Sequence, residues 1–133
     1  QPRSRGLGDV YKRQVLNPKL FTGELYVLVN EFTSSSATVL AATVQCYDLG
    51  TLVGRETGGT QIFFDEPVLL QLPHTGQRIL ASHQFRWCPC GGRATEGVHP
   101  DVEVRWRYAD RVNGVDAELE EVKRLERERR AGV

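Results

Sequence analysis

Three consecutive serines, Ser34, Ser35 and Ser36, lie where a nucleophile gains most from its surroundings. They follow the apolar run of residues 25–29 and precede residues 37–47, a stretch with a helical pattern. A hydroxyl at a tight strand-to-helix turn is exposed, and the N–H groups and dipole of the helix favour the charge of a tetrahedral intermediate. The pattern is therefore compatible with acyl transfer on a serine. The ordinary alternative is that these serines only cap the helix.

The elements around the serines are predicted to form a βαβ unit. Residues 25–29 are continuously apolar, which is typical of a strand buried on both faces of a parallel sheet. Residues 37–47 place apolar side chains on one broad helical face, and Gly50 is suited to end that helix. Residues 52–54 supply a second short strand.

After a flexible loop at residues 58–60, the apolar residues recur with a period of two. Three consecutive strands are expected, over 61–64, 68–72 and 78–81, with residues 83–87 as an extension of the last one. A further short strand is expected at 102–104, and a helix at 116–130 with Asp116 as its N-cap. The predicted fold class is α/β, with a short parallel βα core, then antiparallel strands, then a C-terminal helix.

Short motifs along residues 19–125 resemble, in order and spacing, the C-terminal processing (tail-specific) serine peptidases. The motifs are YVLVN, TSSSAT, VGRET, LPHTG and EGVHPDVEV. The resemblance implies a crotonase- and Clp-protease-like fold of which this chain is the C-terminal part. It also implies that Ser35 is the nucleophile and that the Ser36 N–H contributes to an oxyanion hole. Because three serines are adjacent, the frame stays open among Ser34, Ser35 and Ser36.

The sequence departs from the family pattern at the position of the general base. Many members pair the serine with a lysine in a Gly-Lys-Gly loop, whereas Thr60 holds that place here and no lysine lies between Lys19 and Lys123. The tricorn-like branch uses a histidine from upstream of the nucleophile strand, together with a glutamate. Glu96 lies near the place of that glutamate, so it is a candidate for orienting the histidine. The alternative is that Glu96 is an exposed loop carboxylate.

The three histidines of this chain, His74, His83 and His99, all follow the serines. Each is expected to be structural or exposed rather than a general base, with a position in a cleft as the alternative for His83, which lies in a strand pattern. A serine hydroxyl without a base is a poor nucleophile. We therefore expect this chain alone to be inactive even if its parent is a peptidase.

The first fourteen residues, QPRSRGLGDVYKRQ, show no strand or helix period. The end of this segment can be encoded by GAT GTG TAT AAG AGA CAG, which resembles a transposon mosaic end used in sequencing libraries. We interpret residues 1–14 as translated adaptor on an environmental read, with a natural basic arm as the alternative. Residues 15–133 are then the C-terminal part of a peptidase domain truncated at its N-terminus, which predicts an exposed apolar sheet edge near residues 25–29.

Composition excludes several classes of partner. The chain has 17 Lys and Arg against 17 Asp and Glu, so it offers no electrostatic basis for binding nucleic acid.

The three cysteines and three histidines show no zinc-site spacing, and no metal or cofactor is expected. An odd number of cysteines does not indicate a closed disulfide framework, so Cys46 is expected in the core and Cys88 and Cys90 in a loop. The sequence gives no prediction about a membrane.

Three functions remain in competition. The first is a serine endopeptidase that acts on protein or peptide substrates, and its family resemblance implies an extracytoplasmic location, the periplasm or cell envelope. The second is a non-catalytic module on the same fold that binds a ligand or protein, which the missing lysine and Thr38, in place of a frequent family glutamate, support. The third is an unrelated α/β domain in which the motif series is fortuitous.

Overall fold

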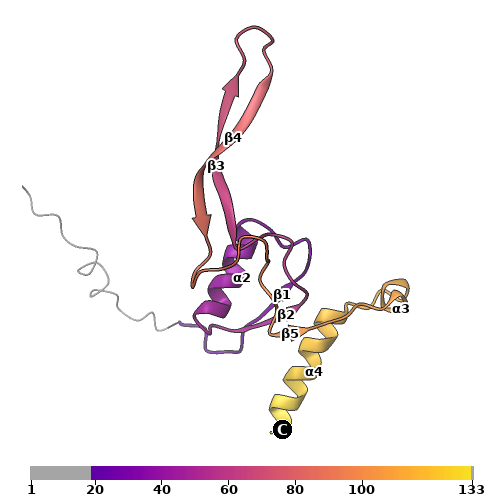
Figure 1. Ribbon diagram of the computed structural model, residues 1–133. Coiled ribbons are helices and arrows are strands. Elements are labelled where there is room, and N and C mark those ends of the chain that lie inside the picture. Colours follow the sequence, from indigo (N-terminus) through magenta and orange to yellow (C-terminus); the bar gives the residue numbers. More distant parts are fainter. Residues whose placement is uncertain (1–18, 133) are drawn as a thin grey trace, which may run out of the picture.

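The computed structural model describes residues 19–132, and its centre is the predicted βαβ unit (Figure 1). Strand β1 (Tyr26–Val29) leads into helix α2 (Ser36–Cys46), which returns to strand β2 (Thr51–Gly54). The two strands pair in parallel, from Tyr26 opposite Thr51 to Val29 opposite Gly54. Strand β5 (Val102–Glu103) adds to the other side of β2, so the sheet order is β1-β2-β5.

The core lies between this sheet and α2. Its buried members come from β1, α2, β2 and the segments after the hairpin: Val29, Ala41, Ala42, Val44, Leu52, Cys88 and Val98. The two alanines are small, which lets the helix lie close to the sheet. The burial fixes the helix relative to β1, and therefore fixes the turn that joins them.

Strands β3 (Ile62–Gln71) and β4 (Arg78–Trp87) form an antiparallel hairpin that projects from the core as an arm (Figure 1). The prediction of separate strands over 61–64 and 68–72 was wrong, because the ladder continues past Pro67. Pro67 lies opposite Ser82 on an unflanked strand, where a residue without an N–H is tolerated. The ladder is irregular only at Glu66, which has no paired residue on β4 and a φ of 53°.

The C-terminal part contains a short helix that was not predicted, α3 (Tyr108–Val112), followed by α4 (Ala117–Ala131). Asp116 caps α4 as predicted, accepting a hydrogen bond from the Leu119 N–H at 2.9 Å. The Tyr26 hydroxyl donates to Glu126 Oε1 at 3.1 Å, which attaches α4 to β1. Figure 1 shows α4 and the hairpin at opposite ends of the core.

The cysteine prediction was wrong in two respects. Cys46 and Cys90 form a disulfide with their Cα atoms 5.8 Å apart, which ties the end of α2 to the loop after β4. Cys46, expected in the core, is only partly buried, whereas Cys88 lies after β4 in a loop as predicted but is a free thiol that belongs to the buried core. The two cysteines are 44 residues apart in the sequence and meet only because the chain returns to α2 after the hairpin. The spacing of the cysteines alone does not specify this pairing.

The apolar edge predicted near residues 25–29 is present. Strand β1 is at one edge of the described sheet, and Leu25 and Leu28 are 39% and 43% exposed. Between residues 19 and 132 no helix has the length and apolarity to cross a bilayer. Residues 1–14 lie outside the described part, so the interpretation of that segment stays a prediction.

Candidate active site

Ser35 lies at the sharp turn between β1 and α2 and has an unusual backbone conformation. Its φ is 55° and its ψ is −127°, a region in which a residue with a side chain is strained by about 1–3 kcal/mol. Its side chain makes no capping hydrogen bond to α2. The hydroxyl is therefore not engaged in the ordinary role of a serine before a helix.

The turn is held by side chains on its N-terminal side. The Asn30 N–H donates to Thr33 Oγ1 at 3.1 Å, and the Thr33 N–H donates back to the Asn30 carbonyl at 2.8 Å. The Thr33 carbonyl then accepts the Gly59 N–H at 2.9 Å, which connects the turn to the loop after β2. These bonds fix the chain immediately before Ser34 and connect it to the loop after β2.

The Gly58-Gly59 pair is required by the close approach of this loop to the serine turn. A Cβ on Gly59 would lie 2.2 Å from Thr38 Oγ1 and 3.2 Å from the Ser35 nitrogen. A Cβ on Gly58 would lie 2.0 Å from the Glu31 carbonyl oxygen. Only glycine can occupy either position without moving the backbone beside Ser35.

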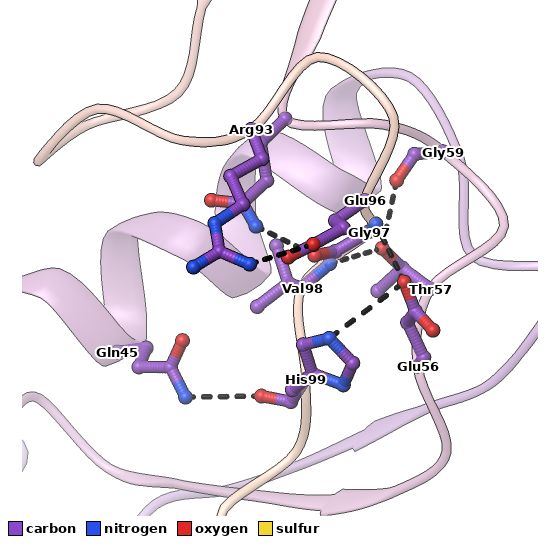
Figure 2. A network of polar contacts seen from close by, with 10 residues as sticks. Gln45, Glu56, Thr57, Gly59, Arg93, Glu96, Gly97, Val98 and His99 are labelled. Carbon is purple, nitrogen blue, oxygen red and sulfur yellow. Dashed lines mark hydrogen bonds and ion pairs between the residues drawn. The ribbon is translucent and has the colours of Figure 1, made fainter.

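Thr57 fixes the position of this glycine loop by hydrogen bonds to Gly59 and to Val98. Its hydroxyl donates to the Gly59 carbonyl at 2.8 Å and accepts the Val98 N–H at 2.8 Å (Figure 2). Its own N–H donates to the Val98 carbonyl at 3.1 Å. Thr57 is buried, so the loop is attached to the same core as α2.

Two cavities open beside Ser35. The larger, of about 460 Å³, is lined by Ser35, Ser36, Val39, Phe63, Asp65, Phe85, Arg86 and Trp87. The smaller, of about 340 Å³, is lined by Ser35, Gly58, Gly59, Thr60, Phe63, Phe64 and Asp65. Both cavities are walled in part by β3, and Ser35 lies where they adjoin, with both hairpin strands on one side and the glycine loop on the other.

Ser36 is the first residue of α2 and lines the larger cavity. The first N–H groups of a helix have no partner within the helix, so they are available to an oxygen that carries developing negative charge. A tetrahedral intermediate formed on Ser35 would lie at this helix N-terminus.

Glu96 is not brought together with Ser35. Its carboxylate pairs with Arg93 at 2.8 Å (Figure 2), and it lines a different cavity, beside Cys46 and Cys90. The neighbouring Glu56 accepts the Gly97 N–H at 2.7 Å. Glu96 is paired with Arg93 within its own loop, and its role in orienting a histidine stays a prediction.

No histidine or lysine lines either cavity at Ser35 in the described part of the chain. His74 lies in the hairpin turn, and the His83 ring contacts the Glu66 carbonyl at 2.5 Å. His99 Nε2 lies 3.9 Å from Glu56 (Figure 2). Thr60 lines the smaller cavity, but its hydroxyl donates to the Ile62 carbonyl at 2.7 Å.

Residue patterns did not indicate the hairpin side chains that wall the larger cavity, of which Phe85 and Trp87 are the most exposed. The period of two did place Phe85 and Trp87 on one strand face, and this is the only signal that was available. Their position over α2 depends on how the hairpin leaves the core, which a local pattern does not specify.

Comparison with known proteins identifies the family. The sequence pattern described as Peptidase family S41 matches residues 3–104. The chain belongs to peptidase family S41. It is 32% identical over 101 residues to Tricorn protease homolog 1 of Streptomyces coelicolor, which is 74% of this chain and 9% of that protein.

The solved structures agree with this assignment. The crystal structure of the tricorn protease matches with a TM-score of 0.60 and 25% identity, over 75% of this chain and 10% of that one. The predicted mixed α/β fold, with a parallel sheet and antiparallel strands, is therefore confirmed. The chain spans about a tenth of the length of these relatives. Both are tricorn proteases, so the S41 family is established but the tail-specific group within it is not.

Proposed function

We propose that this S41 segment carries the nucleophile of a serine endopeptidase, and that the nucleophile is Ser35. The observation that supports this most is the serine turn itself. Ser35 holds a strained backbone conformation, its hydroxyl does not cap α2, and two cavities meet at it. Strain of this kind persists where the surrounding structure over-determines it, as Gly59 and Thr57 do here.

The chemistry follows from these positions. The Ser35 oxygen attacks the carbonyl carbon of the peptide bond while its proton passes to a general base. The oxyanion lies at the start of α2, near the Ser36 N–H. The base then protonates the leaving amine, the C–N bond breaks, and an ester on Ser35 remains. Water, deprotonated by the same base, hydrolyses that ester and restores the serine.

We infer that the general base comes from outside residues 19–132. Neither cavity at Ser35 is lined by a histidine or a lysine, and Thr60 occupies the position of the family lysine. In the same proposal Glu96 remains the candidate for orienting that base, a role in which the base would compete with Arg93 for its carboxylate. The chain alone should therefore show no turnover.

The non-catalytic binding module is the second candidate, and the same observation favours it. A serine between two open cavities without a neighbouring base is also the arrangement of a ligand-binding site on a peptidase fold. The two candidates differ in one property, which is whether the serine becomes acylated in the full-length protein.

An extracytoplasmic location, periplasm or cell envelope, belongs to the proposal. The Cys46–Cys90 disulfide supports it, because disulfides persist mainly in oxidising compartments.

The test is a serine scan in the full-length protein that contains this segment. Ser35→Ala should reduce kcat for casein or peptide hydrolysis on the order of 10⁴–10⁶-fold, as for other serine peptidases, and abolish labelling by a fluorophosphonate. Ser34→Ala and Ser36→Ala are matched controls that should keep most of the activity, since Ser36 acts through its backbone N–H. If Ser35→Ala left turnover intact, the proposal would be wrong. If the wild type bound peptides but never reacted, the binding module would replace it.

A further inference from the structure

We infer that the larger cavity beside Ser35 is a specificity pocket for a bulky, uncharged apolar side chain of the substrate, at a residue that flanks the cleaved bond. Its role in cleavage rests on the proposed function. Its selectivity as a binding pocket rests only on the residues that line it.

The walls of the cavity are mainly apolar and aromatic. Val39 contributes from α2 and Phe63 from β3, and Phe85 and Trp87 contribute from β4. The Phe85 ring meets those of Phe64 and Trp87 edge-to-face, with centroids 5.4 Å and 5.7 Å apart. Such a cluster is a preformed surface on which an aliphatic or aromatic side chain can pack.

Much of this aromatic surface is uncovered. Phe85 is 52% exposed and Trp87 is 62% exposed, although both lie at the base of the hairpin next to the core. An apolar side chain in the cavity would remove part of that surface from water, at about 25 cal/mol per Å² of apolar area. The cavity volume, about 460 Å³, is within the range of small-ligand sites.

The charged residues in the wall neutralise one another. The two charged residues that line the cavity are Arg86 and Asp65, and Arg86 Nε pairs with Asp65 at 3.1 Å. Arg86 also pairs at 3.4 Å with Glu66, which does not line the cavity. A charged substrate side chain would have to break this arrangement or enter without a counter-charge, and either is unfavourable. The wall therefore selects against both acidic and basic side chains.

The position of Ser35 connects the pocket to the bond that reacts. Ser35, Phe63 and Asp65 line both cavities, so an extended peptide that crosses Ser35 presents neighbouring residues to the two sides. The smaller cavity also has aromatic walls, Phe63 and Phe64, beside the glycine loop. The larger cavity adds Val39, Phe85 and Trp87 to Phe63, so it offers the more extensive apolar surface on which to discriminate between side chains.

The test uses the full 133-residue chain and needs no turnover. The probes are capped peptides acetyl-Ala-Ala-X-Ala-amide in which X is Phe, Leu, Ala, Asp or Lys, titrated by NMR. We expect the Phe and Leu peptides to bind at least about tenfold more tightly than the other three, as for a pocket that distinguishes apolar groups by size. Equal affinities, or a preference for Asp or Lys, would overturn the inference.

Two variants locate the binding. Trp87→Ala and Phe85→Ala should each weaken the binding of the Phe peptide several-fold. Because both side chains are half exposed, each variant is expected to fold. Leu80→Ala, at the far end of the same hairpin and 69% exposed, is the matched control and should bind like the wild type. Selectivity unchanged in both aromatic variants would place binding elsewhere and overturn the inference.

The two proposals fail separately. Ser35→Ala in this chain should keep the Phe-over-Ala selectivity, because the pocket walls are unchanged. A pocket that selects apolar peptides in a protein whose Ser35 never reacts would leave the pocket inference standing and remove the peptidase proposal. A reactive Ser35 without selectivity would do the reverse.

Discussion

The parallel core and the β3–β4 hairpin of this chain reach order by opposite means. The core strands have four, four and two residues, yet Leu52 and Val53 are fully buried. The hairpin strands have ten residues each, and almost all of their side chains are exposed. The long hairpin strands are thus held by a continuous ladder of inter-strand hydrogen bonds, which a local turn closes. The short core strands depend instead on the burial of their side chains against segments that are distant in the sequence.

The candidate site uses both regions. The core positions Ser35 through the buried helix, Thr57 and the glycine loop, all of which resist movement. The hairpin supplies Phe85 and Trp87, side chains that rest on a less constrained support. In the proposed mechanism, the reacting group therefore belongs to the buried core region and the discriminating groups to the exposed hairpin.

A matched pair of leucine truncations should separate the two regions most strongly. Leu52→Ala removes a fully buried side chain from β2 and should lower the free energy of unfolding by about 2–5 kcal/mol. Leu80→Ala removes a side chain that is 69% exposed on β4 and should change it by less than about 0.5 kcal/mol. Urea denaturation followed by circular dichroism measures both. Equal losses would mean that the hairpin arm is packed in solution.

The residue pattern predicted the core well because its signals are local. The apolar run before Ser35, the small residues at the turn and the helical spacing after it all point to the same βαβ arrangement, and Asp116 marks the start of α4. The strain at Ser35 was also foreseeable in outline, since a tight strand-to-helix turn concentrates the change of direction in one residue.

The pattern was poor where distant segments meet. The loop after β4 brings Cys90 to Cys46, and no local signal specifies this contact. Pro67 suggested a strand break, but the hairpin ladder continues because the strand has no second neighbour that needs the missing N–H. These errors share one cause, which is that the tertiary course of the chain decided the outcome.

The disulfide attaches the loop after the hairpin to α2 of the core, so its removal should leave the hairpin less firmly attached to the core. Cys46→Ala with Cys90→Ala frees the loop after β4 from α2 and should lower the free energy of unfolding by about 2–4 kcal/mol. Reduction of the wild type should give a similar loss, and the double variant should no longer respond to reductant. Burial raises the pKa of the Cys88 thiol, so this group should stay unreactive to thiol reagents in the folded chain. Reductant sensitivity in the double variant would contradict the assigned pairing.

The smallest effect expected is a pH dependence confined to the core region. The Arg129 hydrogen bond, with a smaller contribution from the Tyr26 hydroxyl, lowers the pKa of Glu126, so its contribution to stability is present above pH 4.5 and is lost as the pH falls below that value. Burial and the bond to Glu126 raise the pKa of Tyr26, so its contribution is present below pH 10 and is lost as the pH rises through the raised value. Hydrogen exchange of β1 and α4 across pH should therefore show loosening at both extremes. Tyr26→Phe should remove the alkaline response and leave most of the acid one, because Arg129 remains.

The hairpin serves as the control region, since it contains no tyrosine and its hydrogen exchange should not follow the alkaline change. If the hairpin loosened in parallel with β1, the core and the hairpin would be one cooperative unit.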